Sequence, residues 1–361
     1  MEKEIKKVLN TIEKNGFEAY IIGGYVRDLL LGRISHDVDI CTNALPKDLI
    51  NLFPDSSVGV YGAVSFKLNK FNFEITTYRK EQDYSNRHPG KVTYINNLLE
   101  DIERRDFRIN TICMNQNGNI IDLLNSSEDL KKKIISPVGN PDDKINDDPL
   151  RILRAIRFAT VLDFKLDDTL VESIKKNRRL INQLSDSRII DEMTKILISA
   201  NYKKGLKMLK DYGILDILEI DCQNVTKTND VIGMWAQLNM KKSLAFNKET
   251  IHNIDIIRKI VSNGNIDRFV LYKYGLYLSM VAGEILNISN KKIASEYAKM
   301  PIKGRKDLNV TTEQIMNLLN IKEGEKIGLI LNDLEKAVLS GHLRNLESDI
   351  KKYLIDYYGV D

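Results

Sequence analysis

Two aspartates separated by one residue, Asp37 and Asp39, are the strongest candidates for chemistry in this chain. If the segment is a strand, its side chains alternate, so both carboxylates share one face while Val38 and Ile40 point into a core. Two carboxylates so spaced can bridge two hard cations such as Mg²⁺, and a metal pair stabilises the attacking and leaving oxygens of an in-line displacement. An Asp-x-Asp pattern alone is weak, because solvated strand edges and turns carry it too.

The residues before this pair provide a place for phosphates. Gly23-Gly24 ends a short apolar run and opens a helix, so backbone amides at the helix start, with Arg27 in its first turn, can receive a triphosphate. A plain tight turn is the alternative. Glu74 lies on the polar face of a following strand and is a candidate third catalytic carboxylate, or else an ordinary surface residue. Together these residues favour metal-dependent phosphoryl transfer.

A second cluster begins at Asp148-Pro149, which is a favourable helix start with Asp as the N-cap and Pro at the first helical position. Arg151, Arg154 and Arg157 follow at intervals of three residues. This spacing predicts that they fan across a broad side of the helix instead of facing a core. A solvated arginine-rich face is the alternative reading.

The elements that must position these residues fall into two parts. Strand signals are confined to the first 135 residues, and the composition changes near Ser136-Pro137. The amino-terminal part is therefore predicted to be a small α/β unit. Its expected elements are helices at 2–15 and 25–31 and strands at 19–22, 37–41, 58–68, 71–78 and 120–123.

From Asp148 onward the apolar periodicity predicts successive helices, grouped into several small helical domains. Breaks are expected near 163–167, 183–187, 199–201, 212–214, 221–229, 262–266 and 301–310. Residues 79–90, between the strand at 71–78 and Arg104, are polar and poor in periodicity, so they are predicted to form a mobile loop.

Composition narrows the class of protein. The 54 Lys and Arg against 50 Asp and Glu give a net charge of +4, but spaced basic clusters in the later chain would suit an extended polyanion. No stretch is long and apolar enough for a membrane span, and no signal core is evident, so a cytoplasmic location is expected. Cys41, Cys113 and Cys222 are widely separated, which indicates neither a disulfide framework nor a zinc site.

Several motifs resemble those of the class II tRNA nucleotidyltransferases, the CCA-adding enzymes of the tRNA nucleotidyltransferase and poly(A) polymerase family. Residues 23–28, 30–33 and 37–40 are similar to the first motif of that family, and 104–110 to its second. The segment 148–159 resembles the part that reads the base, and 187–197 resembles a final structural motif. Residues 301–308, with Gly324 and Gly328, resemble the tRNA-binding end, so the similarity covers essentially the whole chain.

The resemblance implies an α+β protein with a polymerase-β-like nucleotidyltransferase head at 1–136, followed by a helical neck at 137–199, body at 200–270 and tail at 271–361. It implies two Mg²⁺ ions on Asp37 and Asp39, and tRNA, CTP and ATP as partners, with the acceptor and T-stem gripped by the tail. No membrane and no protein partner is expected. The nucleotide-binding residues it implies are Gly23, Gly24, Arg27, Arg105, Asp106, Asn110, Asp148, Arg151, Arg154 and Arg157.

Base selection also follows from elementary chemistry. Cytosine and adenine present an exocyclic amine donor beside a ring-nitrogen acceptor, whereas guanine and uracil present a carbonyl beside an N–H. The carboxylate of Asp148 paired with the guanidinium of Arg151 matches the first pattern and opposes the second. In the resembled family a loop at the position of 79–90 is associated with switching from CTP to ATP, so its presence favours addition of all three nucleotides.

Four alternatives remain open at this point. A partial enzyme would add only the two cytidines or only the adenosine, and a poly(A) polymerase shares the amino-terminal motifs. A metal-dependent phosphohydrolase is suggested by His36-Asp37, but the four histidines are dispersed. A catalytically inactive tRNA-binding protein would not need both aspartates.

Overall fold

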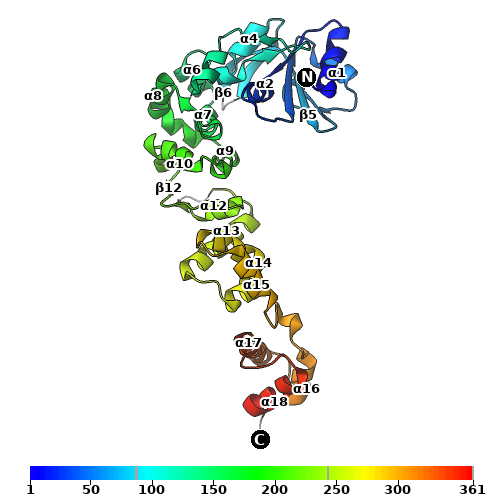
Figure 1. The fold of residues 1–361 in the computed structure, drawn as a ribbon, viewed down its shortest axis with the longest axis vertical. Coiled ribbons are helices and arrows are strands. Elements are labelled where there is room, and N and C mark those ends of the chain that lie inside the picture. The colour runs from blue at the N-terminus through cyan, green and yellow to red at the C-terminus, as the bar shows by residue number, and fades with distance from the viewer. Residues whose placement is uncertain (86–87, 242–243, 360–361) are drawn as a thin grey trace. The chain divides into compact units, whose positions relative to one another are not determined.

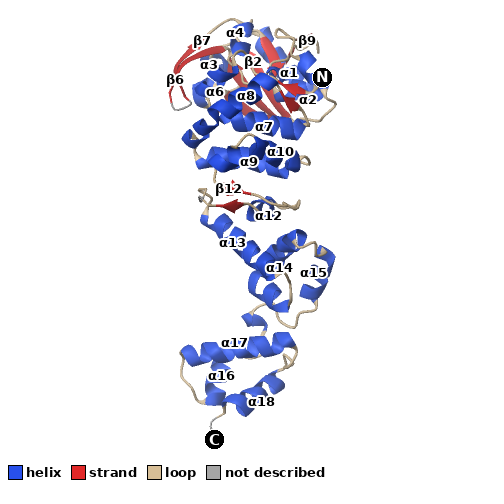
Figure 2. Cartoon of the chain, turned by 90° about the vertical axis from the view of Figure 1, so that its left-hand side faces the viewer, coloured by secondary structure: helices blue, strands red, loops and turns tan. Residues whose placement is uncertain are grey.

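The computed structural model describes residues 1–85, 88–241 and 244–359. The described chain divides into two compact units, Met1–Ile220 with Lys241–Leu244, and Asp221–Met240 with Ala245–Asp361. Most of the strands, red in Figure 2, belong to the first unit, while the yellow to red segments of Figure 1 are almost entirely helical. This arrangement confirms the predicted α+β class with a sheet-containing head and a helical remainder.

A mixed sheet forms the centre of the head, and within the described residues it contains seven strands in the order β3-β4-β5-β2-β1-β8-β9. β2 pairs with β5 in parallel, and all the other neighbours in this sheet are antiparallel. The strands are β1 (Ala19–Ile22), β2 (Asp37–Thr42), β3 (Ser57–Val58), β4 (Val64–Leu68), β5 (Phe71–Thr77), β8 (Cys113–Met114) and β9 (Ile120–Ile121).

The register of β2 against β5 decides which side chains meet. Asp39 lies opposite Glu74 and Asp37 opposite Asn72, so these polar side chains share one face of the sheet. Val38 and Ile40 are fully buried on the opposite face. Helix α1 (Lys3–Lys14) buries one apolar stripe of its own and contacts β1, while α3 (Pro46–Leu52) contacts β4 and β5. The core therefore holds β2 in place from behind and leaves its two aspartates on the open face.

Two predictions for the head were wrong in detail. The strand expected at 58–68 is interrupted by a 3-10 turn, Val60–Gly62, in which Tyr61 has a positive φ of 55°. The loop expected at 79–90 is instead a pair of antiparallel strands, β6 (Arg79–Ser85) and β7 (His88–Tyr94). A two-stranded ribbon satisfies its backbone hydrogen bonds without burying an alternating apolar face, which is why its sequence has no strand periodicity. Residues 86 and 87 of the predicted loop lie outside the described residues.

Besides α1 and α3, the head contains the helices α2 (Gly24–Leu30), α4 (Leu98–Glu103) and α5 (Ser127–Lys132), with a 3-10 turn at Arg108–Asn110. The rest of the first unit contains α6 (Pro141–Asp147), α7 (Leu150–Leu162), α8 (Asp168–Asn177), the 3-10 helix Arg178–Gln183, α9 (Asp186–Ile198), α10 (Tyr202–Asp211) and α11 (Ile214–Ile217). β10 (Ile134–Ile135) pairs in parallel with β11 (Lys165–Leu166), a short strand pair that periodicity did not indicate.

Close packing joins α7, α9 and α10. A Cβ added at Gly205 would lie 2.5 Å from Ile196 Cγ2 and 2.7 Å from Thr160 Oγ1, so only glycine permits α10 to approach this closely. The helix that carries Arg151, Arg154 and Arg157 is consequently held rigidly from its far side.

The second unit has its own core, formed by buried aliphatic residues from Leu271 to Leu354. Its helices are α12 (Val231–Ala236), α13 (Lys248–Asn263), α14 (Arg268–Ile285), α15 (Asn290–Ala298), α16 (Thr312–Leu319), α17 (Glu325–Ser340) and α18 (Glu347–Tyr358), with a 3-10 turn at Arg305–Asp307 and short strands β12 (Ile220–Asp221) and β13 (Asn239–Met240) at its start. The breaks expected near 221–229, 262–266 and 301–310 lie at or next to boundaries between these helices, although 262–266 overlaps the end of α13 and 301–310 contains the 3-10 turn. No helix in the described ranges is long and apolar enough to cross a membrane.

Candidate active site

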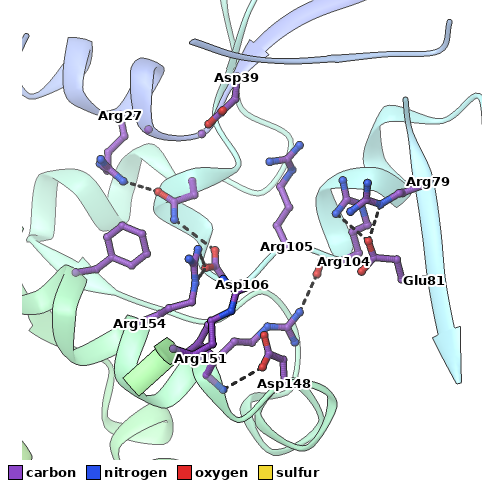
Figure 3. Close-up of a pocket in the computed structure, with 16 residues that line it drawn as sticks. Arg27, Asp39, Arg79, Glu81, Arg104, Arg105, Asp106, Asp148, Arg151 and Arg154 are labelled. Carbon is purple, nitrogen blue, oxygen red and sulfur yellow. Dashed lines mark hydrogen bonds and ion pairs between the residues drawn. The ribbon is translucent and has the colours of Figure 1, made fainter. Parts of the chain in front are cut away.

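An open cavity of about 560 Å³ lies in the first unit, where β2, α2, β6 and the segment that follows α4 face α7. Figure 3 shows charged side chains entering it from all of these elements. The lining residues are Gly23, Gly24, Arg27, Asp39, Arg79, Glu81, Arg104, Arg105, Asp106, Asn110, Asp148, Leu150, Arg151, Arg154, Phe158 and Arg188.

Most of the site residues expected from the sequence meet in this cavity. Those that line it are Asp39, Gly23, Gly24, Arg27, Arg105, Asp106, Asn110, Asp148, Arg151 and Arg154. Asp37 and Glu74 lie beside Asp39 on the sheet but outside the lining, and Arg157 turns away toward α9.

The carboxylates of Asp37, Asp39 and Glu74 differ in exposure. Asp37 is exposed and its Oδ1 accepts a hydrogen bond of 2.8 Å from Asn72 Nδ2, while Glu74 is also exposed. Burial raises the pKa of Asp39 to about 6; Glu74 and Asp37 act in the same direction, and Arg105 and Arg27 oppose it. A buried carboxylate with two like charges nearby is an unfavourable arrangement unless a cation joins it.

In the part of the chain that the structure describes, no group of three or more His, Cys, Asp or Glu side chains is close enough to hold a metal ion. A metal at this place would therefore depend on Asp37 and Asp39, completed by oxygens from outside the protein. That donor set fits Mg²⁺, which keeps several waters and binds through one or two carboxylates plus substrate phosphates.

Gly23 allows the carboxylate of Asp39 to approach the turn before α2. Its φ of 80° lies in the left-handed region that favours glycine, and a Cβ built there would be 3.0 Å from Asp39 Oδ2. Any larger residue would be strained and would also push against that carboxylate. The Gly-Gly motif and the Asp-x-Asp motif, separate in the sequence, thus depend on one another in space.

A chain of polar contacts connects α2 with α7. Arg27 is buried, and its Nη1 donates to Asn110 Oδ1 at 2.7 Å; Asn110 Nδ2 in turn donates to Asp106 Oδ1 at 3.3 Å. Asp106 Oδ2 accepts from Nε and Nη2 of Arg154. Burial by itself raises the pKa of Asp106, but the guanidinium of Arg154 outweighs it and the pKa falls to about 2. Asp106 is therefore a fixed anion whose position sets that of Arg154.

Phe158 provides an apolar support for three arginines. The guanidinium carbons of Arg27, Arg154 and Arg157 lie 5.3, 5.5 and 3.9 Å from its ring centroid. Arg157 is also held by Glu192 of α9, with Nε 2.5 Å from Oε2. Sequence reasoning missed Phe158 as a site residue, because an aromatic on an amphipathic helix reads as part of the core.

The start of α7 differs slightly from expectation. Asp148 closes α6 and α7 begins at Leu150, but the side chain of Asp148 still acts as a cap, with Oδ1 accepting from the Leu150 N–H at 3.0 Å. Arg151 does not fan into solvent: it is 9% exposed, and Nη1 donates to the carbonyl of Lys144 at 2.8 Å. The prediction that the arginines avoid the core was wrong for Arg151, because the backbone of α6 supplies acceptors for it.

Arg79, Glu81, Arg104 and Arg188 also line the cavity without having been singled out from the sequence. Arg79 and Glu81 belong to the segment that is predicted to be a loop. Arg188 belongs to the segment that resembles a final structural motif. The concentration of charged residues at 79–83 was the available signal, but a run of charged residues alone does not identify a strand.

Asp106→Ala is expected to lower the free energy of unfolding by about 2 kcal/mol, because the half-buried guanidinium of Arg154 and the amide of Asn110 lose the hydrogen-bond acceptor that they share. The contribution of Asp106 is present above its ordinary pKa of 3.8 and declines as the pH falls toward 2, so wild type and variant should converge in acid. Urea denaturation at several pH values measures this. Glu128→Gln, which breaks the exposed pair with Lys131, is the control and should leave the midpoint unchanged. Equal stability of Asp106→Ala and wild type at pH 7 would contradict the expectation.

Comparison with known proteins agrees with this geometry. The family model described as "Poly A polymerase head domain" matches residues 19–136, "Probable RNA and SrmB-binding site of polymerase A" matches 163–222, and a model of tRNA nucleotidyltransferase domain 2 matches 237–354. The CCA-adding enzyme of Ligilactobacillus salivarius is 32% identical, covering 95% of this chain and 94% of its own. That of Bacillus cereus is 30% identical, covering 98% of each.

Solved structures support the same assignment. The crystal structure of the Bacillus stearothermophilus CCA-adding enzyme in complex with CTP superposes with a TM-score of 0.88 at 25% identity, covering 99% of this chain and 98% of that one. The Thermotoga maritima CCA-adding enzyme complexed with tRNA shares the fold, with a TM-score of 0.70 at 18% identity over 99% and 96% of the two chains. From the site and from relatives that match along nearly its whole length, this chain belongs to the CCA-adding enzymes.

Proposed function

We propose that this protein adds C, C and A to the 3′ end of tRNA from CTP and ATP, without a nucleic-acid template. The observation that carries the proposal is the meeting of Asp39 with Asp148 and Arg151 in a single cavity. A catalytic carboxylate and a base-reading pair at the same place provide both the chemistry and the selection of nucleotide. The full-length relatives named as CCA-adding enzymes, and the solved relative in complex with CTP, support it.

Asp37 and Asp39 are the proposed metal ligands, with Glu74 as a further carboxylate beside them. Two Mg²⁺ ions, when bound there, would supply the positive charge that stabilises the attacking and leaving oxygens of an in-line displacement. The raised pKa of Asp39 supports the assignment, because burial beside two other carboxylates favours a cation or a proton at that position.

The arginines of the cavity have separate tasks in this proposal. Arg27 and Arg105 receive the triphosphate next to Gly23 and Gly24, while Arg154, oriented by Asp106, contacts the nucleotide from α7. Asp106 and Asn110 lie at the position proposed for the ribose 2′-hydroxyl. Arg157 does not line the cavity, so its share in binding acts through Phe158 and its partner Glu192.

Base selection rests on Asp148 and Arg151. An acceptor carboxylate and a donor guanidinium match the amine and ring nitrogen of cytosine or adenine and oppose uracil and guanine. The backbone contacts of Arg151 and the capping role of Asp148 fix both side chains before a nucleotide arrives. Such preorganised groups discriminate strongly, because a mismatched base leaves buried polar atoms without partners.

The reaction we propose is attack of the tRNA 3′-hydroxyl on the α-phosphate of the bound nucleotide, with departure of pyrophosphate. The protein contributes orientation, because the arginines hold the triphosphate in line with the attacking oxygen and keep its negative charge neutralised. Strand β6 supplies Arg79 and Glu81 to the cavity, which supports a role for the hairpin in switching from CTP to ATP.

For the remainder of the chain we propose the division into head 1–136, neck 137–199, body 200–270 and tail 271–361, with the tail gripping the acceptor and T-stem of tRNA. Helices that recognise duplex RNA do so by shape and phosphate contacts, which suits a chain with dispersed basic clusters. A cytoplasmic location is part of the same proposal.

Purified protein incubated with Mg²⁺, α-labelled CTP and ATP, and tRNA lacking its 3′ end is expected to extend that tRNA by C, C and A. Sequencing the added nucleotides distinguishes the alternatives. Addition of only cytidines or only adenosine would identify a partial enzyme, and processive tailing of unrelated RNA with ATP alone would identify a poly(A) polymerase. No extension with Mg²⁺ present would refute the proposal.

A further inference from the structure

A fully buried carboxylate lies behind the cavity wall without lining it. Asp101 is in the last turn of α4, and its side chain is 0% exposed. A carboxylate withdrawn from water is unfavourable unless charged partners and hydrogen bonds satisfy it. The groups that contact Asp101 therefore indicate its role.

Three donors converge on Asp101. Oδ1 accepts from Arg104 Nε at 2.8 Å and from the backbone N–H of Arg79 at 3.2 Å, and Oδ2 accepts from Arg105 Nη2 at 3.1 Å. The helical spacings of three and four residues bring both guanidiniums to the same carboxylate. Burial raises the pKa of Asp101, but the two arginines outweigh this and lower it, so Asp101 is an anion.

Both arginines held by Asp101 line the cavity. Figure 3 shows Arg105 extending toward Asp39, and its charge is the largest influence that opposes the raised pKa of Asp39. Arg105 Nη2 donates to Asp101, and within the described residues Arg105 Nε is buried without a hydrogen-bond partner. Asp101 is therefore the carboxylate that fixes this guanidinium at the cavity wall.

Arg104 extends the same connection in two directions. Its Nη1 lies 3.3 Å from Glu81 Oε1 on β6, and its backbone carbonyl accepts from Arg151 Nη2 at 3.3 Å. Through Arg104, Asp101 is therefore connected to the hairpin β6–β7 and to Arg151, the proposed base-reading residue.

We infer that Asp101 is a positioning residue for nucleotide transfer, which holds Arg105 in the orientation that binds the triphosphate and contacts no substrate itself. This inference rests on the proposed function for the identity of the ligand. It goes beyond the proposed function because Asp101 lies outside the cavity, and because its removal is expected to weaken phosphate binding more than base binding.

The test measures binding of two fragments of the substrate. Inorganic tripolyphosphate is titrated by calorimetry in the presence of Mg²⁺, and cytidine is measured by competition against CTP. Asp101→Asn is expected to raise the Kd of tripolyphosphate by about tenfold or more, and that of cytidine by less than about twofold. In an Arg105→Ala background the same change should add less than about twofold, because the group it positions is gone.

Asp142→Asn is the matched control, because Asp142 likewise accepts from three donors, Ser173, Lys176 and Asn177, but does not line the cavity. It should leave both affinities unchanged. If Asp101→Asn does not fold, Asp101→Glu keeps the charge, displaces the carboxylate by about one bond length, and should raise the tripolyphosphate Kd about threefold.

Equal weakening of both fragments, unchanged tripolyphosphate binding, or a full additional loss in the Arg105→Ala background would each overturn the inference. Because the fragments bind without any transfer reaction, a wild-type protein that binds them but fails to extend tRNA would refute the proposed function and leave the test of Asp101 intact.

Discussion

Asp39→Asn is expected to lower kcat for nucleotide addition by about 10³-fold or more while leaving the protein folded. Asparagine has nearly the same shape but carries no negative charge, so the proposed metal site keeps only Asp37.

Stability measurements separate this loss from unfolding. In chelator at pH 8, above the pKa of about 6, wild type holds an ionised carboxylate that burial disfavours, so Asp39→Asn should have a Tm no lower than wild type. Asp55→Asn, in an exposed loop of the same head, is the activity control and should extend tRNA normally. Retention of more than about a tenth of wild-type kcat by Asp39→Asn would show that this carboxylate is not a metal ligand.

Asp148→Asn is expected to lower kcat/KM for CTP and ATP by about 10²-fold and to raise the relative use of UTP. The amide of asparagine presents a donor where the carboxylate accepted, so it opposes the exocyclic amine of cytosine and adenine and suits the carbonyl of uracil. Its remaining oxygen still accepts the Leu150 N–H, which is why asparagine tests base reading without removing the cap of α7. Single-nucleotide addition with each of the four triphosphates measures both effects.

Asp167→Asn is the matched control for this experiment. Asp167 caps the neighbouring helix α8 through the same contact, with Oδ1 accepting from the Thr169 N–H at 3.0 Å, but it does not line the cavity. It should change neither rate nor selectivity. If Asp148→Asn loses activity with all four nucleotides by the same factor, Asp148 orients the helix and does not read the base.

Local patterns predicted the components of the site well. The alternation around Asp37 and Asp39 indicated a strand with one buried face, and β2 has Val38 and Ile40 fully buried as expected. The Gly-Gly turn lies where the sequence indicated it, because a positive φ and a helix start are local requirements that glycine reveals. Residues whose role depends on the local backbone conformation were therefore identified from the sequence.

Some residues whose role depends on contacts with distant parts of the chain were not identified from the sequence. The hairpin β6–β7 was read as a loop because two polar strands that pair only with each other show no apolar alternation. Phe158 was not singled out from the sequence, and only its three neighbouring guanidiniums identify it as part of the site. Asp101 has no sequence signal of its own, since a carboxylate at helical spacing from two arginines is common on solvated helices.

The sequence by itself determined the family, the α+β class and most of the residues that line the cavity, because these depend on residue types at short, fixed spacings. Only the tertiary structure decided how Asp39, placed on the sheet by its register with β5, meets Asp148 at the end of α6 and Arg151 on α7 in one cavity. It also decided that Arg151 is buried against α6 and that Asp37 remains exposed. The physical reason is that burial and charge pairing depend on contacts between segments far apart in the chain, which no local pattern encodes.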